Sequence, residues 1–369
     1  MLRIGIEMRA ALGPKTGDRT YLLGLVHGLA ELGTRHEVIL YLDRAPGEEL
    51  TSCPFEVRVV PSASGRLWKQ RVLPRVARAH GIDVLHVQYI PPRCRSPRVV
   101  TTIHDVTYRL FPQWFTLKDR WLLHHGIRRA LPSVAAVITG SECTRRDLQR
   151  VYGLPSERIF VTPYAAYPGL QAPSQDDVAR VRGAHGLTAP YALFLGVLQP
   201  RKNVPRIVEA FRQARAEAGL PHQLIVAGKR GWKSDEAVAA VDEAQRAGVA
   251  RWLGYVPDED VPGLLGGCDL FLFPTLYEGF GLPILEAFVC GAPVITSSVS
   301  SMPEVAGSAA ELVDPSSVPS ITEAIVRVLG DTAKREQLRQ AGRLRATEFS
   351  WARTAELTTE CYERVAGER

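Results

Sequence analysis

Short apolar segments alternate with amphipathic segments along the whole chain, and this alternation restricts the fold more than any other feature. The apolar segments are expected to be strands at 2–7, 36–42, 55–60, 83–88, 98–103, 135–139 and 158–162, and again at 190–196, 223–228, 250–253, 269–273, 292–296 and 309–313. The segments between them have the period of a helix. Strands that alternate with helices form parallel sheets covered by helices, so the sequence predicts an α/β protein.

The length of the chain and one interruption of the pattern indicate two domains. A chain of 369 residues exceeds what one hydrophobic core usually supports. Proline, glycine and polar residues gather at 167–177, as in a linker. We expect an N-terminal Rossmann-like domain at 1–168, a linker at 169–187 and a C-terminal Rossmann-like domain at 188–348. Parallel sheets bind ligands beyond the carboxyl ends of their strands, so the two domains are expected to face a central cleft.

The last segment, 349–369, is expected to form a helix that packs back on the N-terminal domain. Ser350 precedes it as a suitable N-cap residue.

Composition excludes several classes of protein. Apolar residues make up 46% of the chain, which is normal for a globular enzyme and excludes a largely disordered protein. The net charge of +6 suits acidic partners, but no motif supports a nucleic-acid partner. The six cysteines are scattered, as in a reduced cytoplasm. The first residues lead directly into a strand and no apolar run is long enough to cross a bilayer, so we expect a cytoplasmic location.

The segment from Glu278 to Glu286 carries the strongest functional signal. Gly279 and Gly281 flank an aromatic residue and allow a ligand to approach the backbone amides. Pro283 suits a first helical turn, whose unpaired N–H groups attract an anion such as phosphate. Both carboxylates are then able to bind hydroxyl groups beside that phosphate. The alternative is that they only cap and solvate a helix.

Three further sites lie where strands end. Arg201 and Lys202 follow the strand at 190–196, where two cations suit a diphosphate, although a solvated helix start is the alternative. His104 follows the strand at 98–103, either as a functional group or as a structural hydrogen-bonding residue. Gly17 lies at the start of the first helix, where its amide suits a phosphate.

Two clusters, one of acidic residues and one of histidines, are interpreted as structural rather than metal-binding. Asp258, Glu259 and Asp260 have the spacing of a metal-binding motif, but Asp258 as an N-cap with acidic residues in the first turn explains them better. His124 and His125 are adjacent and would point in different directions from a helix. We therefore expect no protein-bound metal and no cofactor.

Several motifs resemble glycosyltransferase family 4, a group of retaining enzymes with the GT-B fold. They occur in order at 252–258 (WLGYVPD), 269–287 (DLFLFPTLYEGFGLPILEA), 290–296 (CGAPVIT), 301–307 (SMPEVAG) and 313–315 (VDP), together with Arg201-Lys202-Asn203, His104-Asp105 and Ser141-Glu142. Within the family, the chain most resembles bacterial mannosyltransferases of surface-polysaccharide assembly.

The resemblance implies that the N-terminal domain at 1–168 binds the acceptor and that the C-terminal domain at 188–348 binds the nucleotide-sugar donor. It also implies a role for each matched residue. Glu286 would bind the ribose hydroxyls of a nucleotide-sugar donor, and Glu278 would bind hydroxyls of the donor sugar. Arg201 and Lys202 would bind the diphosphate, and His104 would touch the donor sugar near the acceptor. The remaining donor contacts would come from Gly279, Phe280, Gly281 and Leu282 at the sugar and phosphate, from Gly17 at the phosphate, and from Tyr255 and Val256 near the base.

Two positions depart from the family pattern. Many relatives have paired glycines in the first loop, where this chain has Thr16, Gly17 and Asp18. Some relatives have a basic residue where this chain has Val197. Binding of the diphosphate is therefore expected to depend on Arg201 and Lys202.

The resemblance implies transfer of a hexose to a saccharide or lipid-linked saccharide, in polysaccharide, glycolipid or lipopolysaccharide biosynthesis. GDP-mannose is the expected donor and a UDP-hexose the alternative. A nucleotide-sugar epimerase and a non-catalytic nucleotide-sugar binding protein remain as other classes. Retention is expected through front-face attack, in which the leaving phosphate takes the acceptor proton, and a double displacement through Glu278 is the alternative.

Aromatic and basic residues occur together in two segments, 113–130 and 66–78. Such segments suit the surface of an anionic bilayer, and we expect the protein to be peripheral at the inner face of the plasma membrane. The alternative is a pair of ordinary amphipathic helices whose aromatic residues face the core.

Overall fold

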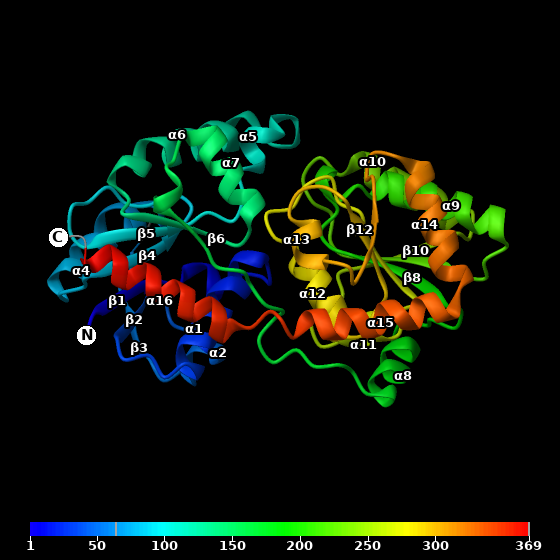
Figure 1. Ribbon diagram of the computed structural model, residues 1–369, viewed down its shortest axis with the longest axis horizontal. Helices are drawn as coiled ribbons and strands as arrows, with labels where there is room; N and C mark the ends of the chain where they lie inside the picture. Colours follow the sequence, from blue (N-terminus) through cyan, green and yellow to red (C-terminus); the bar gives the residue numbers. More distant parts are fainter. Residues whose placement is uncertain (63–64, 368–369) are drawn as a thin grey trace. The chain divides into compact units, whose positions relative to one another are not determined.

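The computed structural model describes residues 1–62 and 65–367 (Figure 1). The chain divides into two compact units. The first comprises Met1–Pro168 and Phe349–Arg369, and the second comprises Gly169–Glu348. Each unit contains a parallel sheet covered by helices. The predicted fold class, α/β with two Rossmann-like parallel-sheet domains, is confirmed.

The first unit contains a seven-stranded sheet in the order β3-β2-β1-β4-β5-β6-β7. Its strands are β1 (Arg3–Glu7), β2 (Glu37–Leu42), β3 (Glu56–Val59), β4 (Val84–Gln88), β5 (Arg98–Thr102), β6 (Ala136–Thr139) and β7 (Ile159–Val161). Every neighbouring pair is parallel. The residues of β4 and β6 are buried throughout, as expected for central strands that are covered on both faces.

Helices connect these strands. The α-helices are α1 (Gly17–Glu31), α2 (Glu48–Thr51), α3 (Gly65–Leu67), α4 (Leu73–Ala79), α5 (Thr107–Leu110), α6 (Leu117–Ala130) and α7 (Glu142–Tyr152). Shorter 3₁₀ turns lie at η1 (Arg9–Leu12), η3 (Pro112–Trp114), η4 (Leu131–Ser133) and η5 (Ser156–Arg158), and η2 (Trp68–Val72) is a π-helical turn.

The last helix, α16 (Trp351–Gly367), belongs to the first unit and lies beside α1 (Figure 1). Ser350 is its N-cap, since the Ser350 hydroxyl accepts a hydrogen bond from the Arg353 amide at 3.1 Å. The Trp351 indole is only 5% exposed and lies directly over α1. A Cβ added at Gly24 would lie 2.1 Å from the Trp351 ring. Small residues on α1 therefore allow the two helices to approach closely.

The second unit contains a six-stranded sheet in the order β10-β9-β8-β11-β12-β13. Its strands are β8 (Tyr191–Leu195), β9 (Gln223–Ala227), β10 (Ala250–Gly254), β11 (Leu270–Phe273), β12 (Val294–Ser297) and β13 (Glu311–Val313), and all neighbouring pairs are parallel. Each predicted strand thus overlaps an observed one in both units.

The helices of the second unit are α8 (Gln175–Ala184), α9 (Val204–Ala218), α10 (Asp235–Arg246), α11 (Val261–Gly266), α12 (Leu282–Val289), α13 (Met302–Ala306), α14 (Val318–Gly330) and α15 (Thr332–Ala346), with a 3₁₀ turn at η6 (Pro200–Lys202). Helices α9 and α14 lie side by side (Figure 1) and share a core with the strands of this sheet.

The predicted linker at 169–187 differs from the structure, because helix α8 lies within it and belongs to the second unit. The Ser174 and Asp177 side chains form a capping box at its start. Arg180 then joins α8 to α11 through an ion pair with Asp260 at 2.8 Å. Within the predicted range, the residues before Ser174 therefore lie outside regular secondary structure, as expected for a linker.

The prediction that Asp258 is an N-cap is wrong. Residues 257–260 form a turn in which the Asp260 amide donates to the Pro257 carbonyl at 3.0 Å, so α11 begins later and Asp260 is at the N-cap position. The Asp260 carboxylate binds Arg180 and His185 rather than the helix amides.

The two aromatic and basic segments differ in exposure. On α6, Leu117 and Trp121 are 78% and 62% exposed, whereas Leu123 packs against the core. In the other segment, Trp68 is fully buried and its indole N–H donates to the Val60 carbonyl at 2.6 Å. Trp68 is therefore excluded from a membrane surface. Among the described helices, none is both long and apolar enough to span a bilayer.

Candidate active site

The carboxyl ends of β8 and β11 are the point at which the strand order of the second sheet reverses. Successive loops diverge there, which is where open parallel sheets bind ligands. The loop after β8 carries Arg201 and Lys202 on the turn η6, and the loop after β11 carries Glu278. These residues lie far apart in the sequence, yet strand order brings them to one edge.

The three charged side chains form one buried cluster. The Lys202 ammonium lies 2.6 Å from Glu278 Oε1, and the Arg201 guanidinium pairs with Glu278 Oε2. Burial by itself would raise the pKa of Glu278, but the charges of Arg201 and Lys202 outweigh it and hold this pKa below its ordinary value. Lys202 Nζ also lies 4.6 Å from the centroid of the Phe273 ring. Glu278 is thus an ionised carboxylate that pairs with both cations and leaves the cluster with one excess positive charge.

Asn203 joins the two loops. It adopts a left-handed conformation with φ of 63° between η6 and α9. Its side-chain amide donates to the carbonyl oxygens of Pro274 at 2.9 Å and Pro315 at 2.7 Å. The bond to Pro274 ties the turn that carries Arg201 and Lys202 to the loop that carries Glu278, and the bond to Pro315 ties it to the segment after β13.

Ser300 and Ser301 support that loop from the turn after β12, a contribution that the sequence analysis missed. The Ser300 hydroxyl accepts from the Glu278 amide at 3.0 Å. The Ser301 hydroxyl lies 2.9 Å from the Glu278 carbonyl oxygen and 2.8 Å from the Phe280 carbonyl oxygen. The sequence feature that could have identified these two residues is a pair of hydroxyl side chains directly after the strand next to β11.

Helix α12 begins directly after this loop, at Leu282, with Pro283 in its first turn. Gly281 precedes it with φ of 115°, and a Cβ at this position would lie 2.6 Å from Met302 Cε. Only glycine suits both the conformation and the close contact. Glu286 is half-buried, one turn into the helix. Gly279 and Phe280 are buried in the loop before it, so the predicted donor-binding residues from Glu278 to Glu286 form one continuous element.

Tyr255 and Val256 follow β10, but their side chains differ in exposure. Tyr255 is 58% exposed, whereas Val256 is only 4% exposed. The Lys229 ammonium lies 4.2 Å from the centroid of the Tyr255 ring. Lys229 lies two residues beyond the adjacent strand β9 and was not among the predicted site residues.

His104 lies in the first unit, just beyond β5. Its ring Nδ1 is 2.9 Å from the Tyr164 hydroxyl, and its Nε2 is 3.0 Å from Gln88 Oε1 and 3.7 Å from Asp18 Oδ1. Burial lowers the pKa of His104, and the charges of Asp18 and Asp105 offset this only in part. The imidazole is therefore neutral near pH 7 and held by two hydrogen bonds.

Gly17 also lies in the first unit, as the first residue of α1. The Thr16 hydroxyl caps this helix by accepting from the Arg19 amide at 3.5 Å. Asp18, next to Gly17, is the residue that reaches His104. The predicted site residues thus form two groups, with His104 and Gly17 in the first unit and all the others in the second.

Models of known protein families match both units of this chain. Residues 16–166 match the family model "Glycosyltransferase Family 4", and residues 176–345 match "Glycosyl transferases group 1". The chain is 36% identical over 277 residues to O-antigen chain mannosyltransferase B of Escherichia coli, which covers 74% of this chain and 72% of that relative.

Solved structures share the fold. The structure of Anabaena Alr3699/HepE in complex with UDP and glucose has a TM-score of 0.75 at 19% identity, covering 99% of this chain and 100% of that one. WaaG, a glycosyltransferase involved in lipopolysaccharide biosynthesis, has a TM-score of 0.71 at 19% identity with the same coverage. Two Rossmann-like domains of this kind define the GT-B class of glycosyltransferases. The chain belongs to glycosyltransferase family 4.

Proposed function

We propose that this enzyme transfers mannose from GDP-mannose, with retention of configuration, to a saccharide or lipid-linked saccharide in surface-polysaccharide synthesis. The observation that carries the proposal is the buried cluster of Glu278, Arg201 and Lys202 at the switch point of the second sheet. The mannosyltransferase name of the Escherichia coli relative supports mannose as the transferred sugar.

The cluster suits a diphosphate donor. Arginine and lysine bind phosphate oxygens strongly, and fixed cations stabilise the negative charge that a nucleoside diphosphate gains as it leaves. When the diphosphate takes these two cations, Glu278 is released from them and accepts hydrogen bonds from the hydroxyls of the donor sugar. Glu286, one turn into α12, binds the ribose.

Transfer follows a front-face course. The bond between the anomeric carbon and the phosphate oxygen breaks, and the acceptor oxygen bonds to that carbon on the same face. The acceptor proton passes to the departing phosphate. Glu278 serves as a binding group rather than a nucleophile in this course, because its released carboxylate accepts hydrogen bonds from the donor-sugar hydroxyls. His104, neutral and buried, orients the reacting sugar.

No metal ion is required in this mechanism, since Arg201 and Lys202 supply the positive charge that a divalent ion would otherwise supply. We expect activity to survive treatment with EDTA. Complete loss of activity in EDTA, restored by a divalent ion, would contradict this part of the proposal.

A thermal-shift screen with nucleoside diphosphates, followed by mass analysis of products, tests the function. A ligand at about 100 times its dissociation constant adds roughly 2.7 kcal/mol of stability. GDP is expected to stabilise the protein, and GDP-mannose is expected to yield a heavier acceptor. Stabilisation by UDP alone would favour a UDP-hexose donor, the alternative that the HepE complex with UDP and glucose supports. Conversion of the donor without an acceptor would indicate an epimerase, and binding without turnover would indicate a non-catalytic protein.

Helix α6 is proposed to dock on an anionic bilayer at the inner face of the plasma membrane, where a lipid-linked acceptor would be available. Leu117 and Trp121 are exposed on this helix, and Arg128 and Arg129 are exposed in its last turn. Exposed apolar and basic groups on one helix suit the interface of an anionic membrane.

Sedimentation with anionic liposomes tests the docking. Binding is expected at low salt and should weaken at high salt, since each nearby cation adds about 1 kcal/mol. Neutralising Arg128 and Arg129 of α6 should reduce binding, whereas neutralising the exposed Arg212 and Arg246 of the second unit should not. Equal binding by the two sets of variants, or none at low salt, would refute the docking.

A further inference from the structure

The polar groups around His104 determine which of its two ring nitrogens carries the proton. A neutral imidazole has one N–H donor and one acceptor nitrogen, and the hydrogen bonds of the two nitrogens select between the tautomers. His104 Nε2 lies 3.0 Å from Gln88 Oε1, and Nδ1 lies 2.9 Å from the Tyr164 hydroxyl. Gln88 and Tyr164 are each only 3% exposed, so solvent does not compete for these bonds.

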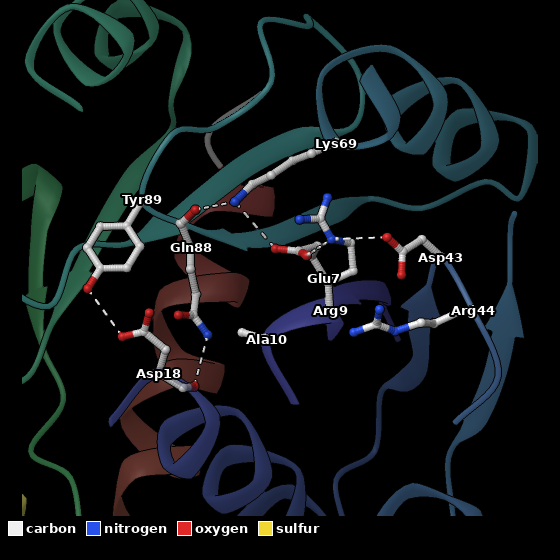
Figure 2. A pocket seen from close by; sticks show the side chains of 9 residues that line it. All are labelled: Glu7, Arg9, Ala10, Asp18, Asp43, Arg44, Lys69, Gln88 and Tyr89. Atoms are coloured by element: carbon white, nitrogen blue, oxygen red, sulfur yellow. Dashed lines mark hydrogen bonds and ion pairs between the residues drawn. The ribbon is translucent and has the colours of Figure 1, made fainter. Parts of the chain in front are cut away.

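The backbone of Asp18 fixes the orientation of the Gln88 side chain. The Gln88 amide nitrogen donates to the Asp18 carbonyl oxygen at 3.2 Å, and a carbonyl oxygen is able only to accept (Figure 2). The Gln88 amide oxygen therefore points to His104. Because this oxygen has no proton to donate, the proton of the bond between the two side chains belongs to His104 Nε2. The Asp18 carboxylate, 3.7 Å from Nε2, favours the same tautomer.

Tyr164 supplies the bond on the other side of the ring. Since Nε2 holds the single proton of the neutral imidazole, Nδ1 is an acceptor and the Tyr164 hydroxyl donates to it. Burial raises the pKa of Tyr164 well above its ordinary value, so the hydroxyl keeps its proton. The one lone pair of Nδ1 is thus occupied, and His104 has no nitrogen that is open to a proton from a substrate.

The ring of Tyr164 is held in place by three neighbours. It stacks on Trp351 of α16 with 6.2 Å between the ring centroids, and it lies 4.8 Å from the ring centroid of Tyr21 on α1. A Cβ added at Gly140, directly after β6, would lie 2.7 Å from the Tyr164 ring. The Tyr164 hydroxyl is therefore a fixed point, and the bond to it sets the orientation of the imidazole.

The Nε2 edge of His104 is the edge that a ligand is able to reach. Tyr164, beside Nδ1, is buried, whereas the Asp18 side chain, beside Nε2, is 38% exposed. Asp18 and Gln88 line a cavity of about 260 Å³ at the carboxyl edge of the first sheet, and Glu7 and Asp43 are among its other lining residues (Figure 2). A substrate oxygen that approaches His104 from this side meets an N–H donor.

We propose that Tyr164 and Gln88 are positioning residues that hold His104 as a hydrogen-bond donor protonated at Nε2, and that they thereby prevent it from acting as a general base. The proposal rests on the proposed function, in which His104 orients the reacting sugar. The Nε2–H group donates to an oxygen of that sugar, while Nδ1 stays bonded to Tyr164. The acceptor proton accordingly passes to the leaving phosphate and not to the imidazole.

Nitrogen NMR of the full chain with isotope-labelled histidine tests the tautomer directly, because protonated and unprotonated ring nitrogens have well-separated signals. The His104 signals are identified by their loss in His104→Asn. We expect a proton on Nε2 and an unprotonated, hydrogen-bonded Nδ1 at pH 7. A ring that is protonated at Nδ1, or at both nitrogens, would overturn the proposal.

Two variants test the role of Tyr164. Tyr164→Phe keeps the ring but removes the donor, so the Nδ1 signal of His104 should move to that of a nitrogen without a hydrogen bond. In the same variant kcat should fall about tenfold with little change in KM. Gly140→Ala, which displaces the Tyr164 ring, should move the same signal. Tyr41→Phe is the matched control, since the Tyr41 hydroxyl lies 2.8 Å from His80 Nδ1 in the same unit. It should change only the His80 signals and leave transfer unchanged.

An Nδ1 signal of His104 that stays the same in both Tyr164→Phe and Gly140→Ala would refute the positioning role, as would normal kcat in Tyr164→Phe. Nucleoside diphosphate binding to the original chain separates this failure from failure of the proposed function. If neither GDP nor UDP binds, the proposed function is refuted even where the NMR signals are as expected. If one of them binds and transfer occurs while the proton of His104 lies on Nδ1, only the positioning role is refuted.

Discussion

Replacing Glu278 by glutamine should destabilise the free protein and strengthen its binding of a nucleoside diphosphate. The substitution keeps the shape of the side chain but removes the one negative charge that pairs with both Arg201 and Lys202. Breaking a buried ion pair by removing one partner costs about 3–5 kcal/mol. Arg201 retains some contact with solvent, with 23% of its side chain exposed, so the lower end of this range applies.

A loss of about 3 kcal/mol corresponds to a decrease of roughly 6–12 °C in the melting temperature of a domain of this size. The diphosphate restores negative charge beside the two cations, and in the variant it has no carboxylate to displace. We therefore expect about tenfold tighter binding of the nucleoside diphosphate and a larger thermal shift than in the original chain. Transfer should nevertheless slow, because Glu278 no longer binds the donor sugar.

The effect of pH has a defined sign. The pKa of folded Glu278 lies below its ordinary value of 4.5. The stabilisation by this carboxylate is therefore complete above pH 4.5 and is lost as the pH falls through the folded-state pKa. The free energy of unfolding of the Glu278→Gln variant should therefore depend less on pH in the acidic range.

Differential scanning fluorimetry across pH, with and without nucleoside diphosphate, measures these effects. Glu323→Gln, an exposed carboxylate of the same unit, is the control and should behave like the original chain. A melting temperature unchanged by Glu278→Gln, or weaker diphosphate binding in that variant, would refute the reasoning.

Three further predictions concern single side chains. Lys202→Ala should lower the transfer rate on the order of 10²-fold, measured at saturating donor, if the ammonium stabilises the leaving diphosphate. Glu286→Ala should weaken donor binding with little change in kcat, while Glu278→Ala should mainly lower kcat; near-normal kinetics in both would contradict the site assignment. Trp351→Ala should cost about 3–5 kcal/mol in urea unfolding because the indole is buried against α1, whereas Leu344→Ala, 71% exposed, should cost much less.

The sequence by itself determined the layers of the fold. The strands coincide with short, mostly apolar segments, and several helices begin at a side-chain cap, as at Thr16 before α1 and Ser350 before α16. These signals are local and remain readable without the rest of the molecule. The segment from Glu278 to Glu286 also stood out for a local reason, since glycine and proline mark a loop that leads into a helix.

Only the tertiary structure decided which of these local elements meet. Glu278 and Lys202 are 76 positions apart, and they touch because β8 and β11 are neighbours in the sheet. The cavity of the first sheet likewise depends on the order β2-β1-β4, which brings Asp43, Glu7 and Gln88 to one edge. Helical and strand periods specify which face of an element is buried, but not its neighbour. The choice of neighbour depends on how the separate apolar faces pack into a common core, which is a property of the whole domain.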